Sequence, residues 1–242
     1  MGIVRMGPPN DLILMLKECS EVNSFIETGT YLGNTAYWSS QKFEQVITLE
    51  YSTEMYQQAT QKYGHVENIK FLQGDSRVLL QEIVSSLKQP SMFWLDAHWS
   101  GGQTYGEEDE CPLLEELEII NASPYDHIIL IDDARLFLSP PPAPHRIEHW
   151  SDISAVIDCL NLVKNRYTVI IEDVIISVPN KFKPVLAQYC QDLNTKLWEE
   201  YGKQQNTKIQ EGLKLILQGM KQTTLKLLPG TKKILNTMKR NG

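Results

Sequence analysis

Six acidic residues, each at or just after the end of a short apolar run, are the side chains best placed to do chemistry in this chain. They are Glu27, Glu50, Asp75, Asp96, Asp132 and Asp133. Carboxylates can accept hydrogen bonds from sugar hydroxyls, take up protons or hold a cation. In one segment two glycines also leave room for a ligand beside the backbone, and it reads Glu27-Thr28-Gly29-Thr30-Tyr31-Leu32-Gly33-Asn34-Thr35. The sequence therefore predicts an acid-rich ligand site.

The apolar runs in front of these acids read as buried strands. Four of them are short and largely apolar, at residues 46–49, 69–72, 92–95 and 128–131. Such runs are typical of strands that are buried on both faces, as in a parallel sheet. Helix-like segments alternate with them, at residues 52–63, 78–87 and 112–120. The alternation predicts a doubly wound α/β domain, in which ligands bind outside the carboxyl ends of the strands.

The predicted fold class is α/β, with a doubly wound, mostly parallel seven-stranded sheet and a C-terminal helical appendage. We expect a catalytic domain over residues 1–182 that begins with a helix at 10–20 and ends with an antiparallel strand pair at 167–172 and 174–178. Residues 183–242 read as a basic extension of helices that breaks at Pro229-Gly230. We expect this extension to pack on the domain or on a second subunit; the alternative is a surface for a membrane or another anionic partner.

Charge is unevenly distributed along the 242 residues, whose net charge is −7. Residues 183–242 contain 11 Lys/Arg against 4 Asp/Glu, so the rest of the chain is strongly acidic. An acidic domain lacks the basic face of a nucleic-acid enzyme, so we expect no nucleic-acid partner. No apolar run approaches the ~20 residues of a membrane span, so no stable membrane insertion is expected. Four scattered cysteines favour reduced thiols and a cytoplasmic location.

The spacing of the acids indicates a nucleoside that carries a positive group. Glu50 ends the second strand some twenty residues after the glycine loop, where an acid can accept hydrogen bonds from ribose hydroxyls. Asp75 suits an adenine amino group or a cationic part of the ligand. The loop lacks the full Gly-x-Gly-x-x-Gly of dinucleotide folds, which makes a pyrophosphate cradle a poor match.

These motifs resemble those of class I S-adenosylmethionine-dependent methyltransferases, and among them the metal-dependent O-methyltransferases of the catechol and macrocin type. The resemblance covers roughly residues 25–135. It rests on the glycine segment given above together with Ile47-Thr48-Leu49-Glu50, Gly74-Asp75-Ser76 and Trp94-Leu95-Asp96. It implies a Rossmann-like methyltransferase fold, S-adenosylmethionine as the cofactor and Mg²⁺ as a second one.

The resemblance also implies residue roles. Glu50 would bind the ribose, Asp75 and Ser76 would lie at the adenine, and the remaining cofactor-binding residues would be Glu27, Thr28, Gly29, Tyr31, Gly33, Asn34, Thr35, Tyr51 and Asp96. The metal ligands would be Asp96, Asp132 and Asp133, since oxygen ligands suit Mg²⁺. Asp132 and Asp133 converge only if the strand has already turned, because successive strand residues point to opposite faces.

The acceptor side departs from the catechol-type pattern. Asp133 stands where those enzymes have Asn, and Trp99 stands where they have a catalytic lysine. His98 is the nearest titratable side chain, so we expect it to act as general base, with Asp96 and Asp133 beside it as catalytic residues. The segment 100–111 is expected to form an acceptor-side loop. The proline-rich segment 134–145 should be a lid, a wall or a plain connection, without a helix, and the weaker acceptor-pocket candidates are His145 and His149.

The sequence thus favours a methyltransferase that acts on a hydroxyl of a small molecule or sugar with the help of Mg²⁺, with a homodimer as a candidate assembly. Three alternatives stay open at this point. One is a metal-free N-methyltransferase, and another is a nucleotide-sugar or dinucleotide enzyme of a related fold. The third is a non-catalytic binding module whose basic extension is the working surface.

Overall fold

The structure is a computed structural model that describes residues 7–99 and 109–238, with side chains of the last helix described as far as Gln218, Asn206 excepted. Most of the predicted acceptor-side loop, residues 100–108, therefore lies outside the described residues. The chain divides into two compact units, Met1–Gln188 and Tyr189–Gly242. Each unit is described by itself below.

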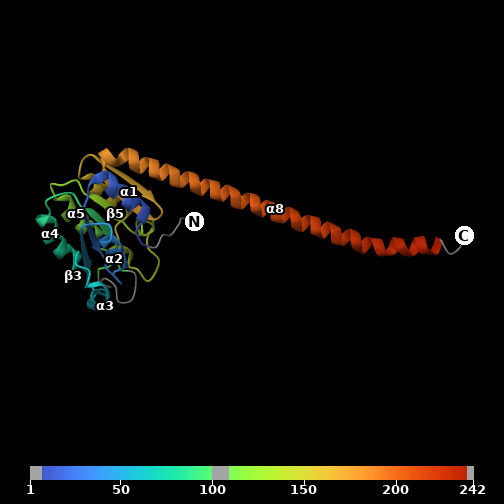
Figure 1. Cartoon of the computed structure of the whole chain (residues 1–242), viewed down its shortest axis with the longest axis horizontal. Helices are drawn as coiled ribbons and strands as arrows, with labels where there is room; N and C mark the ends of the chain where they lie inside the picture. The colour runs from blue at the N-terminus through green and yellow to red at the C-terminus, as the bar shows by residue number, and fades with distance from the viewer. Residues whose placement is uncertain (1–6, 100–108, 239–242) are drawn as a thin grey trace. The chain divides into compact units, whose positions relative to one another are not determined.

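The first unit is built on a seven-stranded sheet (Figure 1). Its strands are β1 (Ser24–Thr28), β2 (Gln45–Glu50), β3 (Ile69–Gln73), β4 (Met92–Leu95), β5 (Ile128–Ile131), β6 (Arg166–Ile171) and β7 (Val174–Pro179). The order is β3-β2-β1-β4-β5-β7-β6. The strands β1 to β5 are parallel, and β7 is antiparallel to both of its neighbours. The predicted α/β fold with a mostly parallel sheet is thereby confirmed as a mixed sheet.

Helices cover both faces of the sheet (Figure 1). They are α1 (Asn10–Ser20), α2 (Asn34–Ser40), α3 (Thr53–Tyr63), α4 (Ser76–Ser86), α5 (Leu113–Asn121), α6 (Arg135–Leu138) and α7 (Ile153–Asn161), with single 3-10 turns η1 (Ile147–His149) and η2 (Asn180–Phe182). Alternate strand residues such as Ile26, Phe93 and Ile129 pack into one cluster with α4, α5 and α7. Their neighbours face the opposite side, where Phe25 contacts Phe43.

The strand order reverses at β1, which lies between β2 and β4. In open α/β sheets the ligand crevice forms at such a point, outside the carboxyl ends of the strands. The register aligns those ends, because Thr28 lies opposite both Leu49 and Leu95, and Leu95 lies opposite Ile131. The residues that follow these positions are therefore brought to one edge of the sheet.

Two helical segments differ from the sequence-based expectation. The proline-rich segment, expected to contain no helix, contains one helical turn, α6. This turn can form because it ends at Leu138, before the prolines that begin at Pro140, which lack a backbone N–H. The expected break at Pro229-Gly230 is wrong, since α8 (Lys183–Met238) is one continuous helix. One proline removes a single helical hydrogen bond and kinks a helix without ending it when the neighbouring turns persist. None of the helices in the described part of the chain has the length and hydropathy needed to cross a bilayer.

Candidate active site

The loop between β1 and α2 contains two glycines with left-handed backbones. Gly29 has a φ of 86° and Gly33 a φ of 73°, values that side chains disfavour. A Cβ at position 29 would overlap the carbonyl oxygen of Asp96, and one at position 33 would lie 3.1 Å from the ring of Tyr63. The sequence suggested that these glycines admit a ligand. In the structure their lack of a side chain lets the loop pack against the backbone after β4 and against α3.

Glu50 ties the end of β2 to this loop. Its Oε2 accepts a hydrogen bond from the backbone N–H of Tyr31, and its Oε1 accepts one from Ser52, both at 2.8 Å. Burial raises the pKa of Glu50, while these backbone hydrogen bonds lower it in part. The backbone N–H of Tyr51 also acts on this carboxylate, and because a carboxylate has about four lone-pair sites, some acceptor capacity remains for a ligand. Tyr31 and Tyr51 are both more than half exposed beside it, at 57% and 51%.

Two carboxyl groups are buried under the loop. Glu27 accepts a 2.6 Å hydrogen bond from Thr48, and Glu116 of α5 accepts one of 3.4 Å from Thr28. Burial raises the pKa of Glu27 to about 8 and that of Glu116 to about 7. Glu116 was not predicted as a site residue. Its signal was present in the sequence, because it lies on the helix face of Leu113, Leu117 and Ile120, where an acid is out of place.

Asp75, Ser76 and Asn34 form contacts that belong to the fold. Asp75 caps α4, accepting a hydrogen bond from the backbone N–H of Arg77, and its carboxylate pairs with the Arg77 guanidinium at 2.7 Å. That guanidinium lowers the pKa of Asp75. Ser76 is buried at the first turn of the same helix. The Oδ1 of Asn34 accepts hydrogen bonds from Lys62 and Tyr63, both at 3.0 Å.

Asp96 follows β4 and Asp132 follows the neighbouring strand β5, so the two carboxyl groups interact electrostatically. Burial, followed by the charges of Asp132 and Asp133, raises the pKa of Asp96 well above its usual range. Burial and the charge of Asp133 raise the pKa of Asp132 to about 7. The carboxyl ends of β4 and β5 thus bring together acids whose neutral form is favoured in this environment, and a cation bound beside them would favour their ionised form instead.

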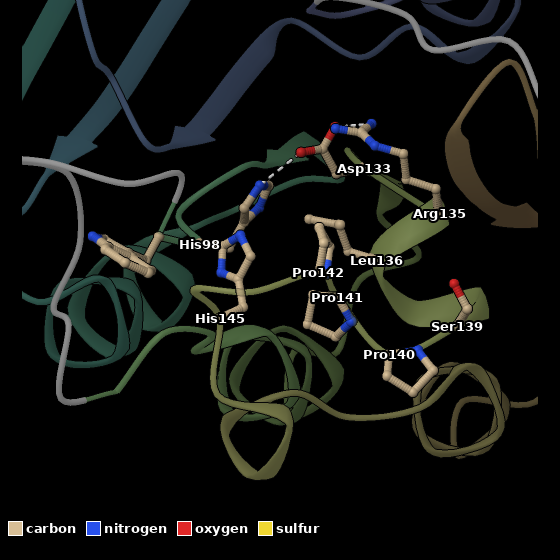
Figure 2. A pocket seen from close by; sticks show the side chains of 10 residues that line it. His98, Asp133, Arg135, Leu136, Ser139, Pro140, Pro141, Pro142 and His145 are labelled. Atoms are coloured by element: carbon tan, nitrogen blue, oxygen red, sulfur yellow. Dashed lines mark hydrogen bonds and ion pairs between the residues drawn. The ribbon is translucent and has the colours of Figure 1, made fainter.

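Asp133 is held by cationic and hydrogen-bonding partners (Figure 2). Its φ of 55° shows that the chain has turned after β5, which is the condition for its carboxylate to lie on the same side as Asp132. The Oδ2 of Asp133 lies 2.9 Å from Nε2 of His98, and its Oδ1 lies 2.5 Å from Arg135. Arg135 also pairs with Asp173. Burial would raise the pKa of Asp133, but His98 and Arg135 outweigh it and lower that pKa.

The three aspartates do not fit a metal site as they are placed here. Both carboxylate oxygens of Asp133 are engaged, one by His98 and one by the Arg135 cation, which competes with a metal for the same lone pairs. Among the residues whose side chains the structure describes, no group of three or more His, Cys, Asp or Glu is arranged to hold a metal ion. Oδ1 of Asp96 lies 3.7 Å from Nδ1 of His98, and Oδ1 of Asp132 accepts a hydrogen bond from the backbone N–H of Asp133 at 2.8 Å.

A cavity of about 360 Å³ opens beside His98 and Asp133 (Figure 2). His145 also lines it, with its ring drawn next to that of His98 in Figure 2, and the remaining lining residues are Trp99, Arg135, Leu136, Ser139, Pro140, Pro141 and Pro142. The proline-rich segment therefore forms a wall of the cavity. His149, the other histidine considered from the sequence, is not among the described residues that line it.

The wall is fixed by Glu110, a residue that the sequence did not single out. Its buried carboxylate accepts hydrogen bonds from the Trp150 indole at 2.6 Å, the Arg146 backbone at 2.9 Å and the His145 ring at 3.1 Å. Burial would raise the pKa of Glu110, but these hydrogen bonds prevail and lower it. The carbonyl oxygen of Glu110 accepts a hydrogen bond from the backbone N–H of Trp99 at 2.7 Å. Glu110 thus ties Trp99 to the segment that carries His145 and Trp150.

Comparison with known proteins gives the fold. No protein-family model matches the sequence, and no curated protein is significantly similar to it. A Staphylococcus aureus protein described as a caffeoyl-CoA O-methyltransferase has a TM-score of 0.52 at 18% identity, over 73% of this chain and 86% of its own. An O-methyltransferase from Bacillus cereus in complex with SAH has a TM-score of 0.52 at 15% identity, over 72% and 82%. The chain therefore has the fold of the class I S-adenosylmethionine-dependent methyltransferases, and the resemblance noted in its sequence is confirmed at that level.

Proposed function

We propose that this protein is an S-adenosylmethionine-dependent methyltransferase that methylates a hydroxyl group of a small molecule or sugar. The observation that carries the proposal is the juxtaposition of the β1, β2 and β4 ends with a cavity that contains the His98–Asp133 pair. In this proposal the strand ends would bind the cationic nucleoside. The cavity would bind the acceptor, with His98 beside it as the base. Neither nucleic acid nor a dinucleotide is part of this proposal.

The donor set suits the cofactor. S-adenosylmethionine, when bound, supplies a methyl group on a positively charged sulfonium, which becomes a neutral thioether after transfer. Glu50 would use its remaining acceptor capacity for the ribose, and Asp75 with Ser76 would border the adenine. Burial and, after it, the neighbouring carboxylates raise the pKa values of Asp96 and Asp132, and a cation beside them would stabilise their ionised forms.

His98 is the proposed general base. Asp133 is ionised, because its pKa is lowered, and therefore accepts the hydrogen bond from Nε2–H of His98. This favours the tautomer that leaves the lone pair on Nδ1, the nitrogen that lies 3.7 Å from Oδ1 of Asp96. The acceptor hydroxyl would give its proton to Nδ1 as its oxygen forms the new bond to carbon. Holding the two reactants in line contributes ~7–11 kcal/mol in favourable cases.

The experiment that tests the proposal is titration calorimetry with S-adenosylhomocysteine and, separately, with NAD. Binding of the first and not of the second is expected. Transfer of labelled methyl groups to a panel of hydroxylated and amine acceptors then distinguishes O-methylation from N-methylation, because a neutral amine needs no base and should not depend on His98. Binding of NAD alone would contradict the proposal.

Chelation tests the Mg²⁺ requirement that the resemblance implies. Because Arg135 and His98 occupy the Asp133 carboxylate, we expect turnover to persist in EDTA, with unchanged affinity for S-adenosylhomocysteine. Activity that disappears in EDTA and returns with Mg²⁺ would show that the three aspartates rearrange into a ligand set. Either result leaves the methyltransferase proposal intact.

A further inference from the structure

The helix α8 has an apolar stripe that is exposed to solvent. Its members are exposed to 59% at Ile209, 55% at Leu213, 60% at Ile216 and 58% at Leu217. Residues spaced by three, four, seven and eight positions lie on the same side of an α-helix. Four large aliphatic side chains therefore form one surface. In sequence, apolar residues continue at the same helical spacing with Met220, Leu227, Leu228, Ile234, Leu235 and Met238.

All charged residues of the chain beyond Glu211 are basic. After Glu211 the sequence contains no acidic residue, and its basic residues are Lys214, Lys221, Lys226, Lys232, Lys233, Lys239 and Arg240. At 3.6 residues per turn, Lys214 lies about 100° around the helix from Leu213, beside the stripe. A helix with an apolar stripe and a basic polar face is typical of segments that lie in a membrane interface.

We propose that residues 209–238 of α8 bind to an anionic membrane surface, with the apolar stripe at the boundary of head groups and acyl chains and the basic residues at the lipid phosphates. Charge complementarity favours this partner over a second copy of the chain. Pairing two such stripes in parallel would place lysines against lysines, with no acid after Glu211 to compensate. The proposal is independent of the enzymatic one.

A pair of matched variants of the full-length chain tests the stripe. Leu217→Asn removes a member of the stripe, whereas Leu215→Asn makes the same change at a residue that is 68% exposed and lies about 200° around the helix. Both are assayed by sedimentation with vesicles of phosphatidylcholine mixed with phosphatidylserine. We expect Leu217→Asn to bind about tenfold more weakly than the wild type, and Leu215→Asn to bind like the wild type.

Charge is tested with Lys214→Gln, Lys221→Gln and Lys226→Gln. Each should weaken binding about fivefold, and added salt should weaken binding of the wild type. Vesicles of phosphatidylcholine alone should not bind. Circular dichroism controls for an intact helix. Failure of the wild type to sediment with the anionic vesicles, or equal effects of the two leucine variants, would overturn the proposal. So would sedimentation velocity that shows a dimer lost in Leu217→Asn without vesicle binding, a result that assigns the stripe to a second copy.

Discussion

At the scale of single residues, the proposed chemistry depends on the 2.9 Å contact between His98 and Asp133. Removing the base with His98→Ala should lower turnover by about 10²- to 10⁴-fold. Asp133→Asn should lower it as well, because an amide can donate to Nε2 and so stabilise the wrong tautomer. Affinity for S-adenosylhomocysteine should stay near that of the wild type in both. Labelled-methyl turnover and calorimetry on the same samples measure the two quantities.

The exposed His65 provides the control for that experiment, since His65→Ala removes an imidazole at a site away from the cavity. Its turnover should equal that of the wild type. If His98→Ala retains full activity, the acceptor is not deprotonated by this residue, and an amine substrate becomes the favoured assignment.

In the proposal Glu50 has a double role, because the carboxylate that accepts from the backbone N–H groups of Tyr31 and Ser52 would also bind the ribose. Glu50→Ala should weaken S-adenosylhomocysteine binding by ~1.5–3 kcal/mol through loss of charge-assisted hydrogen bonds. It should also lower the thermal midpoint, because the N–H groups of Tyr31 and Ser52 lose their acceptor. The exposed Glu44→Ala should change neither quantity. Affinity within about twofold of the wild type, in a folded Glu50→Ala protein, would rule out the ribose role.

At the scale of elements, Glu110 fixes the segment that carries His145 and Trp150. Glu110→Gln keeps one acceptor oxygen but replaces the other with an NH₂ group. That group cannot accept hydrogen bonds from the Trp150 indole or the Arg146 backbone. We expect a loss of ~2–3 kcal/mol in unfolding free energy, in the range for hydrogen bonds to charged groups, and altered tryptophan fluorescence. Glu148→Gln, at an exposed position nearby, is the matched control. An unchanged thermal midpoint and emission spectrum in Glu110→Gln would contradict the fixing role.

The difference between Glu110 and the acids at the strand ends shows what the sequence can reveal. Strand-end acids are predictable because a buried run, a turn and an acid are neighbours in sequence, and parallel strands bring them to one edge. The partners of Glu110 lie 35, 36 and 40 residues away, so no local pattern marks it. The pairing of Arg135 with Asp133 and Asp173 also depends on where β7 enters the sheet. The loop glycines were predictable as a turn, but their contacts with Asp96 and Tyr63 were not.

At the scale of the whole molecule, the buried acids make stability depend on pH. The pKa of Glu27 is about 8 in the folded protein, against an ordinary value of 4.5. Between these values the unfolded chain has lost the proton and the folded chain has kept it, so the folded state binds more protons. Unfolding free energy should therefore fall as pH rises from about 4.5 to about 8. Glu116, with a pKa of about 7, adds to the same trend.

Glu27→Gln isolates this effect, because the neutral amide keeps an oxygen that can accept the Thr48 hydroxyl. Urea unfolding at several pH values should show a shallower decline than the wild type, with the variant relatively more stable at the alkaline end, by about 1.4 kcal/mol for each pKa unit removed. Glu54→Gln, at an exposed position, should follow the wild-type curve. Parallel curves for Glu27→Gln and wild type would show that Glu27 does not hold its proton.

The close approach of Gly29 to the Asp96 carbonyl has a consequence for how the proposed methyltransferase could acquire new substrates. No side chain can be added at position 29 without displacing the backbone after β4, so the two loops on the donor side cannot vary one at a time. Positions 139, 140 and 142–144 of the wall have no such restriction, since they are exposed. Libraries for laboratory evolution should therefore randomise those positions and leave residues 27–33 and 96 unchanged.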